Sequence, residues 1–163
     1  MSLPATLQRF RQTLGMRLFG WLKIPLLASV RPSVVELSET RCVVRIPLRR
    51  RTRNHLGSMY FGALAIGADC AGGLLAMDQI KRSGGAVSLV FRSFQATFLK
   101  RPESDVYFVC EQGEAIRDQV RRTLASEERI TEPMAIQAVV KLPDGSLEPV
   151  AEFTLDLSLK RKG

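Results

Sequence analysis

The sequence predicts an α+β fold in which an antiparallel β-sheet wraps around one long, apolar helix. Residues 59–81 form the apolar helical stretch, and extended segments rich in β-branched and aromatic residues lie on both sides of it along the chain. A helix that is apolar on nearly all sides has to be covered on nearly all sides, and a curved sheet provides that cover. We therefore expect a helix, two strands, the long helix and four further strands, in that order.

The chain has the size and composition of one compact domain. It contains 163 residues, of which 45% are apolar and 25% are charged, and it has no low-complexity tract or internal repeat. We divide it into an N-terminal segment, residues 1–32, and a folded domain, residues 33–163. We expect this chain to fold alone or as a homo-oligomer.

The N-terminal segment has the pattern of a basic amphipathic helix from Leu3 to Leu27. Apolar residues recur at helical spacing: Leu7, Phe10, Leu14, Leu18, Trp21 and Leu22. Basic residues lie mostly between them, and Pro25 interferes with the helix near its end. The segment has too many charges to span a bilayer and lacks the features of a secretory signal. We expect its apolar face to pack on the domain or on a partner subunit, with a membrane interface as the alternative.

A hairpin is predicted next, from segments 33–37 and 41–48, which a polar turn separates. The basic loop Arg49 to Arg53 follows and leads to the long helix, for which Ser58 is the expected N-cap. The sequence Ser83-Gly84-Gly85 is expected to end that helix.

The rest of the chain is predicted to be mainly extended. The expected strands are residues 86–100, 105–111, 131–142 and 148–159, and the periodicity within residues 112–128 predicts a short amphipathic helix. Pro143-Asp144-Gly145-Ser146 has the composition of a turn between the last two strands.

Cysteine and histidine usage argues against several kinds of chemistry. Cys42, Cys70 and Cys110 are far apart and odd in number, which indicates neither a disulfide framework nor a zinc knuckle and suits a reducing, cytoplasmic location. His55 is the only histidine, so a metal-ligand cluster or a catalytic triad is not expected.

The net charge of +8 makes anionic partners plausible. Nucleic acid, an acidic membrane surface and the phosphates of a coenzyme A thioester would all be attracted, and a solvated basic surface is the alternative. Nucleic acid is the weakest of these partners, because aromatic residues do not interleave with the charges as stacking platforms would.

Asp69 is the only charged residue between Met59 and Met77, and small residues surround it. Burying a charged, unpaired carboxylate is costly, so this one must be hydrogen-bonded, protonated or used in chemistry. It is the residue that makes an enzyme plausible. A structural Asp, bonded to backbone groups or to a neighbouring side chain, is the alternative.

The chain resembles the hotdog-fold acyl-CoA thioesterases of the phenylacetate-degradation type over roughly residues 34–159. That family carries Asn-x-x-Gly-x-x-His-Gly-Gly before the central helix and an Asp eight residues after the first Gly of His-Gly-Gly. The corresponding residues are Asn54, Gly57, Tyr60, Phe61, Gly62 and Asp69. Phe98-Leu99-Lys100-Arg101-Pro102 is similar to the family's aromatic-Leu-basic-Pro sequence. The whole chain resembles still more an uncharacterised hotdog branch of unknown function.

The resemblance implies roles for these residues, although Tyr60 replaces the family's His and Phe61 replaces its first Gly. The backbone N–H of Phe61, next to Gly62, would polarise the thioester carbonyl. Asp69 would activate water or attack the carbonyl carbon, and Asn54 would position substrate or water. Expected substrate contacts are His55, Tyr60, Arg92, Lys100 and Arg101. No cofactor or metal is implied.

The spacing of the two main residues also predicts an oligomer. Phe61 and Asp69 lie roughly 12 Å apart along one helix, so they cannot both reach one carbonyl. A thioester site would need the helix start of one subunit beside the Asp of another, in a homodimer or a dimer of dimers. The alternative is a non-catalytic hotdog protein that binds acyl groups or lipids, with Phe61 closing the oxyanion position.

Overall fold

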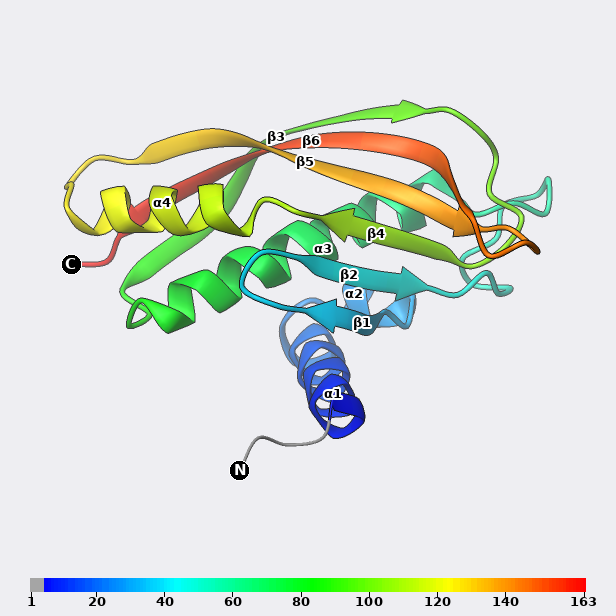
Figure 1. Cartoon of the computed structure of the whole chain (residues 1–163), viewed down its shortest axis with the longest axis horizontal. Coiled ribbons are helices and arrows are strands. Elements are labelled where there is room, and N and C mark those ends of the chain that lie inside the picture. The colour runs from blue at the N-terminus through cyan, green and yellow to red at the C-terminus, as the bar shows by residue number, and fades with distance from the viewer. Residues whose placement is uncertain (1–4) are drawn as a thin grey trace.

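The computed structural model describes residues 5–163, and its elements follow the predicted order (Figure 1). The four helices are α1 (Ala5–Lys23), α2 (Pro25–Ser29), α3 (Phe61–Arg82) and α4 (Gly113–Leu124). The six strands are β1 (Ser33–Leu37), β2 (Cys42–Ile46), β3 (Val87–Phe98), β4 (Val106–Cys110), β5 (Ile130–Lys141) and β6 (Leu147–Arg161). The α+β prediction is confirmed, and so is the hotdog arrangement of a sheet curved over a central helix.

One antiparallel sheet contains all six strands, in the order β1-β2-β4-β5-β6-β3. The strands at its two edges are therefore β1 and β3. The sheet curves over α3, which crosses beneath it (Figure 1). This topology leaves the whole outer side of β3 without a strand partner within the described chain.

Small residues let α3 lie close against the concave face of the sheet. A Cβ atom added at Gly67 would lie 2.2 Å from the ring of Phe108, and one added at Gly72 would lie 2.4 Å from the end of Met134. The helix is long and apolar enough to cross a membrane, but half of its most apolar window is buried inside the protein. In this fold α3 is the core helix.

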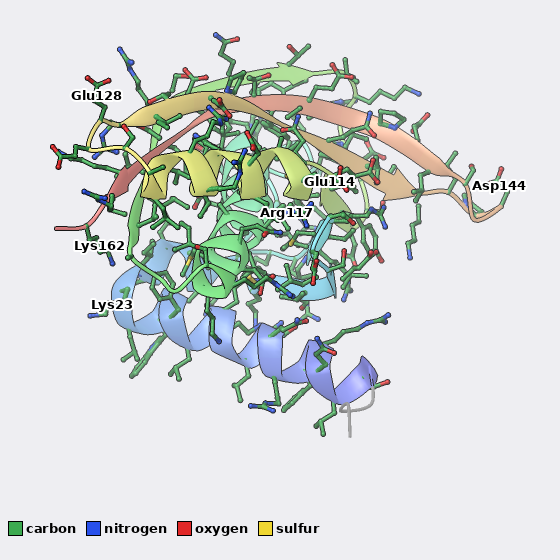
Figure 2. All side chains as sticks on the ribbon, turned by 60° about the vertical axis from the view of Figure 1, so that its left-hand side comes forward. Lys23, Glu114, Arg117, Glu128, Asp144 and Lys162 are labelled. Atoms are coloured by element: carbon green, nitrogen blue, oxygen red, sulfur yellow. The ribbon has the colours of Figure 1, made fainter. Side chains whose placement is uncertain are left out.

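Helix α1 forms a further layer below α3, on the side away from the sheet (Figure 2). Two side chains attach it to β1 and the residue before it: Thr13 Oγ1 accepts a hydrogen bond of 2.9 Å from the Val34 N–H, and Arg17 Nε donates one of 2.8 Å to the Pro32 carbonyl. Gly20 lets α1 and α2 pack closely. These contacts are made by polar and small residues, not by the predicted apolar stripe.

Two sequence predictions need correction here. The expectation that the apolar face of α1 packs on the domain is wrong within the chain, because Leu7, Phe10, Leu14, Leu18, Trp21 and Leu22 are all exposed. Ser58 is not the N-cap of α3, because Tyr60 occupies that position and the Ser58 hydroxyl bonds to Asn54 instead. The part of the predicted N-terminal helix before Ala5 lies outside the described residues. Pro25 does break this helix, since α1 ends at Lys23 and α2 starts at Pro25.

Candidate functional site

Asp69 lies near the middle of α3 on the wall of a cavity of about 1030 Å³. The cavity is bounded by the second half of α3, by the first half of β3 and by α1 with the segment that follows it. Most of its wall is apolar and includes Met16, Phe19, Leu74 and Phe91. The predicted carboxylate therefore faces a large, mainly hydrophobic space.

The carboxyl group of Asp69 has no hydrogen bond or ion pair with any side chain or backbone group in residues 5–163. The side chain is half-buried, and burial raises the pKa of this carboxyl group. Its Oδ1 atom is 3.9 Å from the position that a Cβ of Gly73 would take. The alternative was a structural Asp69 held by hydrogen bonds. The described chain contains no such hydrogen bonds.

Two lysines also line this cavity, and no sequence pattern predicts that they lie there. Lys81 comes from the end of α3, and Lys162 follows the last strand. Lys162 lies at the end of the molecule where α1 ends at Lys23 (Figure 2). The sequence did not predict that Met16 and Phe19 line the cavity either, because helical periodicity does not tell which flank of a helix borders a cavity.

The amino end of α3 has two backbone N–H groups available. Phe61 and Gly62 begin the helix, and neither N–H has a hydrogen-bond partner in the described chain. The Tyr60 ring covers Gly62, since a Cβ added there would lie 2.5 Å from that ring. Phe61 is 58% exposed, and its ring lies 4.7 Å from that of Tyr60, centre to centre. This end of the helix can donate hydrogen bonds to a negatively charged oxygen.

An aromatic cluster extends from this helix end to β3. The ring of Phe61 packs edge-on to Phe98, and both Phe98 and Phe94 pack against the buried Phe153. Phe94 and Phe98 nevertheless remain about half exposed at the free edge of the sheet. The cluster marks an apolar surface that the chain itself does not cover.

Asn54 holds the loop before α3 in shape. Its Oδ1 accepts hydrogen bonds from the backbone N–H groups of Leu56 at 2.9 Å and Ser58 at 3.2 Å, and its Nδ2 donates one of 3.1 Å to Ser58 Oγ. These local bonds use both ends of the side-chain amide. Asn54 therefore positions the loop that leads to Tyr60.

The predicted substrate contacts, Tyr60 included, are exposed and do not line the cavity that holds Asp69. His55, Arg92, Lys100 and Arg101 are all exposed, and none of them lines the cavity that holds Asp69. Lys100 also forms an ion pair with Glu148. Phe61 and Asp69 both belong to α3, eight residues apart, which corresponds to about 12 Å of helix. One chain does not bring the two together.

A family model described as "Domain of unknown function (DUF4442)" matches residues 15–158. The chain belongs to this family. No curated protein sequence matches the DUF4442 chain.

Solved structures with the same fold include several thioesterase-family proteins. A candidate thioesterase from Shewanella oneidensis has a TM-score of 0.74 at 14% identity, over 93% of this chain and 99% of that one. A protein of unknown function from Pseudomonas aeruginosa, also a candidate thioesterase, has a TM-score of 0.72 at 20% identity, over 99% and 98%. A thioesterase from Haemophilus influenzae has a TM-score of 0.59 at 14% identity, over 88% of both chains. At these identities, the likeness establishes the hotdog fold of the DUF4442 chain.

Proposed function

We propose that this DUF4442 protein hydrolyses acyl thioesters, with acyl-CoA as the substrate class. The observation that carries this proposal is the Asp69 carboxyl group, half-buried and without a partner, on the wall of a large apolar cavity. Hydrolysis needs a base beside a space that accepts an acyl group, and here both are present.

In the proposed reaction, Asp69 removes a proton from a water molecule as the water oxygen attacks the thioester carbonyl carbon. The carbonyl oxygen becomes an oxyanion, which accepts a hydrogen bond from a backbone N–H at the start of α3. The tetrahedral intermediate then collapses, the C–S bond breaks, and the proton held by Asp69 passes to the leaving thiolate. The products are a carboxylic acid and a thiol. A raised pKa suits this role, because it makes the carboxylate a stronger base.

The proposed site requires two chains. The N–H of Phe61 and the carboxylate of Asp69 are too far apart on one α3, so the oxyanion donor comes from the partner of a symmetric dimer. The free edge of β3 supports this assembly. It exposes Val90, Phe94 and Phe98, an unusual feature for an edge strand that stays unpaired.

The two halves of β3 also favour an antiparallel pairing across a two-fold axis. Residues 87–91 line the cavity of Asp69, whereas Phe94 and Phe98 belong to the aromatic cluster at the start of α3. Antiparallel pairing of two β3 strands would set the second half of one beside the first half of the other. The helix start of one subunit would then lie at the cavity of its partner.

The cavity wall favours an acyl group that is apolar. Burying each methylene of such a group contributes roughly 0.8 kcal/mol, so a hydrophobic acyl chain would be bound more tightly than a short one. The exposed basic residues Arg92, Lys100 and Arg101 are proposed contacts for coenzyme A phosphates at the mouth of the assembled site. We place the protein in the cytoplasm, because its three cysteines are free thiols in the described chain.

The direct test measures thiol release from short, long and aromatic acyl-CoA thioesters. Asp69→Asn and Asp69→Ala should each lower kcat by about 100-fold or more, the usual contribution of a general base. Asp78→Asn is the matched control, since Asp78 lies on the same helix and pairs with Arg82 outside the cavity. Equal turnover by the wild type and both Asp69 variants would refute the proposed role.

A second pair of variants tests the shared site. Phe61→Pro removes the N–H donor, and proline is well tolerated at the first position of a helix. Phe61→Pro and Asp69→Ala should each be inactive alone. An equal mixture, after subunit exchange, should recover about a quarter of wild-type activity, because half the dimers would carry one intact site of two. No recovery by a mixture shown to form heterodimers would argue against a site built from two chains.

The second candidate function is acyl or lipid binding without catalysis. It is favoured by the aromatic rings at the start of α3, where Tyr60 covers Gly62 and Phe61 stands in place of a glycine of the resembling family. This protein would bind acyl-CoA tightly, release no thiol, and bind equally well as Asp69→Asn.

A further inference from the structure

Helix α1 carries an apolar stripe that faces away from the rest of the protein. We define the stripe as Leu7, Phe10, Leu14, Leu18, Trp21 and Leu22, and each is between 44% and 70% exposed. Figure 2 shows α1 as the outermost layer, with side chains extending from its far side. At about 100° per residue, the six residues fall within an arc of about 120°, opposite the buried Met16.

The stripe continues past the end of α1. Ile24 and Leu26 are also large, apolar and exposed, and Leu26 belongs to α2. Such a continuous apolar surface is larger than the scattered exposed hydrophobic residues of ordinary protein surfaces. Met16 and Phe19 line the cavity from the other flank of α1, and the apolar surface meets the cavity at Ile24.

The charged residues of α1 and of the segment that follows it, up to Arg31, are all positive. Arg11 lies within the arc of the stripe, whereas Arg9 and Lys23 project from the opposite side of α1; these three residues and Arg31 are exposed, and the first acidic residue of the chain is Glu36. None of these four basic residues takes part in an ion pair with the described chain. The exposed loop residues Arg49, Arg50 and Arg51 border the same hollow as Arg31, beyond the end of α2. The apolar surface therefore contains one unpaired positive charge, Arg11, and the other charges of α1 and of the segment beyond α2 are also positive.

We propose that the stripe of α1 binds the surface of an anionic lipid bilayer. Trp, Phe and Leu side chains would enter the boundary between headgroups and acyl chains, and Arg11 would contact lipid phosphates, while the other basic residues would add longer-range attraction to the anionic surface. A helix of this composition lies in the membrane surface without crossing it. The proposal rests on the exposed face of α1 and not on the chemistry of Asp69.

Charge and side-chain type favour the bilayer over two other occupants. A second copy of the stripe would bury Arg11, which lies within the arc of the stripe, in an apolar interface that has no acidic residue to pair with it. Nucleic acid would satisfy the basic residues but would leave the aliphatic side chains of Leu14 and Leu18 in water. Of these three, the anionic bilayer provides partners for both kinds of residue.

The chain contains its own reporter for this contact, because Trp21 is its only tryptophan and is 70% exposed. The experiment adds vesicles of phosphatidylcholine with about one-third phosphatidylglycerol, or vesicles of phosphatidylcholine alone, to the full chain. With the anionic vesicles, Trp21 emission should shift to shorter wavelength and the protein should sediment with the lipid. High salt should weaken this binding, because it screens the lipid phosphates.

Leu14→Glu combined with Leu18→Glu should reduce vesicle affinity by at least about tenfold. Both residues are exposed, so the variant should fold, which circular dichroism and gel filtration would verify. Leu147→Glu is the matched control, since Leu147 is an exposed leucine on β6 outside the stripe, and its vesicle affinity should stay close to that of the wild type.

Three results would overturn the proposal. The first is wild-type protein that does not sediment with anionic vesicles. The second is Trp21 emission that is already blue-shifted without lipid and changes only with protein concentration, which would assign the stripe to a second copy. The third is unchanged vesicle binding by the double glutamate variant. Thioesterase activity enters none of these readouts, so failure here leaves the catalytic proposal standing, and the reverse also holds.

Discussion

Asp69 and Asp105 are both half-buried carboxylates, yet they lie in opposite electrostatic environments. Burial by itself raises the pKa of Asp105, but Arg45 and the Leu48 N–H hydrogen-bond its carboxylate, each at 2.8 Å, and together hold its pKa below the usual value. Asp69 has no such partner, and burial raises its pKa. Partial burial alone therefore does not tell what an aspartate does.

The hydrogen-bond partners of Asp105 make it a structural carboxylate, whereas the carboxylate of Asp69, which has no partner, is available to a ligand. Asp105 joins β2 to the segment before β4, because Arg45 lies on β2. Its lone pairs are engaged, and its charge stabilises the fold. The Asp69 carboxyl group lies on the wall of the cavity and accepts no hydrogen bond from the described chain, so its lone pairs remain available to a water molecule or a substrate.

The largest expected contrast is in the pH dependence of catalysis. If Asp69 is the base, kcat/KM should rise with pH by about tenfold per unit until the raised pKa of Asp69 is passed, and then level off. Asp105→Asn should keep the same midpoint, because its carboxylate does not face the cavity. Initial rates over about pH 4 to 9, with controls for folding at each pH, measure this. A pH profile of kcat/KM whose midpoint shifts in Asp105→Asn would refute the distinction between Asp69 and Asp105.

An intermediate effect is expected on stability. Asp105→Asn should lower the free energy of unfolding by about 1 to 3 kcal/mol at neutral pH, since it removes charge-assisted hydrogen bonds that are partly exposed to solvent. The folded pKa of Asp105 is lowered, so this stabilisation is present above the unfolded value of about 3.9 and is lost as pH falls through the folded value. Urea unfolding at several pH values tests both statements. A difference in the free energy of unfolding between wild type and Asp105→Asn that grows as the pH falls would contradict them.

The smallest effect has the opposite sign. Asp69→Asn should raise the free energy of unfolding by about 0.5 to 2 kcal/mol at neutral pH, because it removes a charge that burial disfavours. The folded pKa of Asp69 is raised, so the wild type is free of this penalty below the unfolded value of about 3.9 and acquires it as pH rises through the folded value. The advantage of the variant should therefore disappear in acid. Destabilisation by Asp69→Asn at neutral pH would indicate a hydrogen-bonded, structural Asp69.

Sequence reasoning located the elements well where the signal was local. The segment 33–37 and the helix that follows the basic loop were predicted from β-branched residues, turn residues and apolar composition, and the structure has β1 and α3 there. Asp69 was identified because a charge in an apolar helix is conspicuous. The family resemblance and the fold agree with these local signals.

What the sequence did not reveal depends on contacts between distant segments. Ser58 was an ordinary N-cap candidate, but Asn54 competes for its hydroxyl, and side-chain partners of this kind cannot be read from spacing. The stripe of α1 was expected to pack, since most amphipathic helices do. In the structure the side chain of Arg17 bonds to the Pro32 carbonyl and the stripe faces outward. The periodicity of the sequence does not predict this orientation of α1.

The eight residues between Phe61 and Asp69 have a consequence for how much protein a cell needs. If the reaction needs the helix start of one chain and the carboxylate of another, the monomer is catalytically inactive. At concentrations well below the dimer dissociation constant, total activity would then grow with the square of the protein concentration, because the pair is the active species. The expression level would then act as a threshold, because a modest fall in protein abundance would lower the total reaction rate more than proportionally.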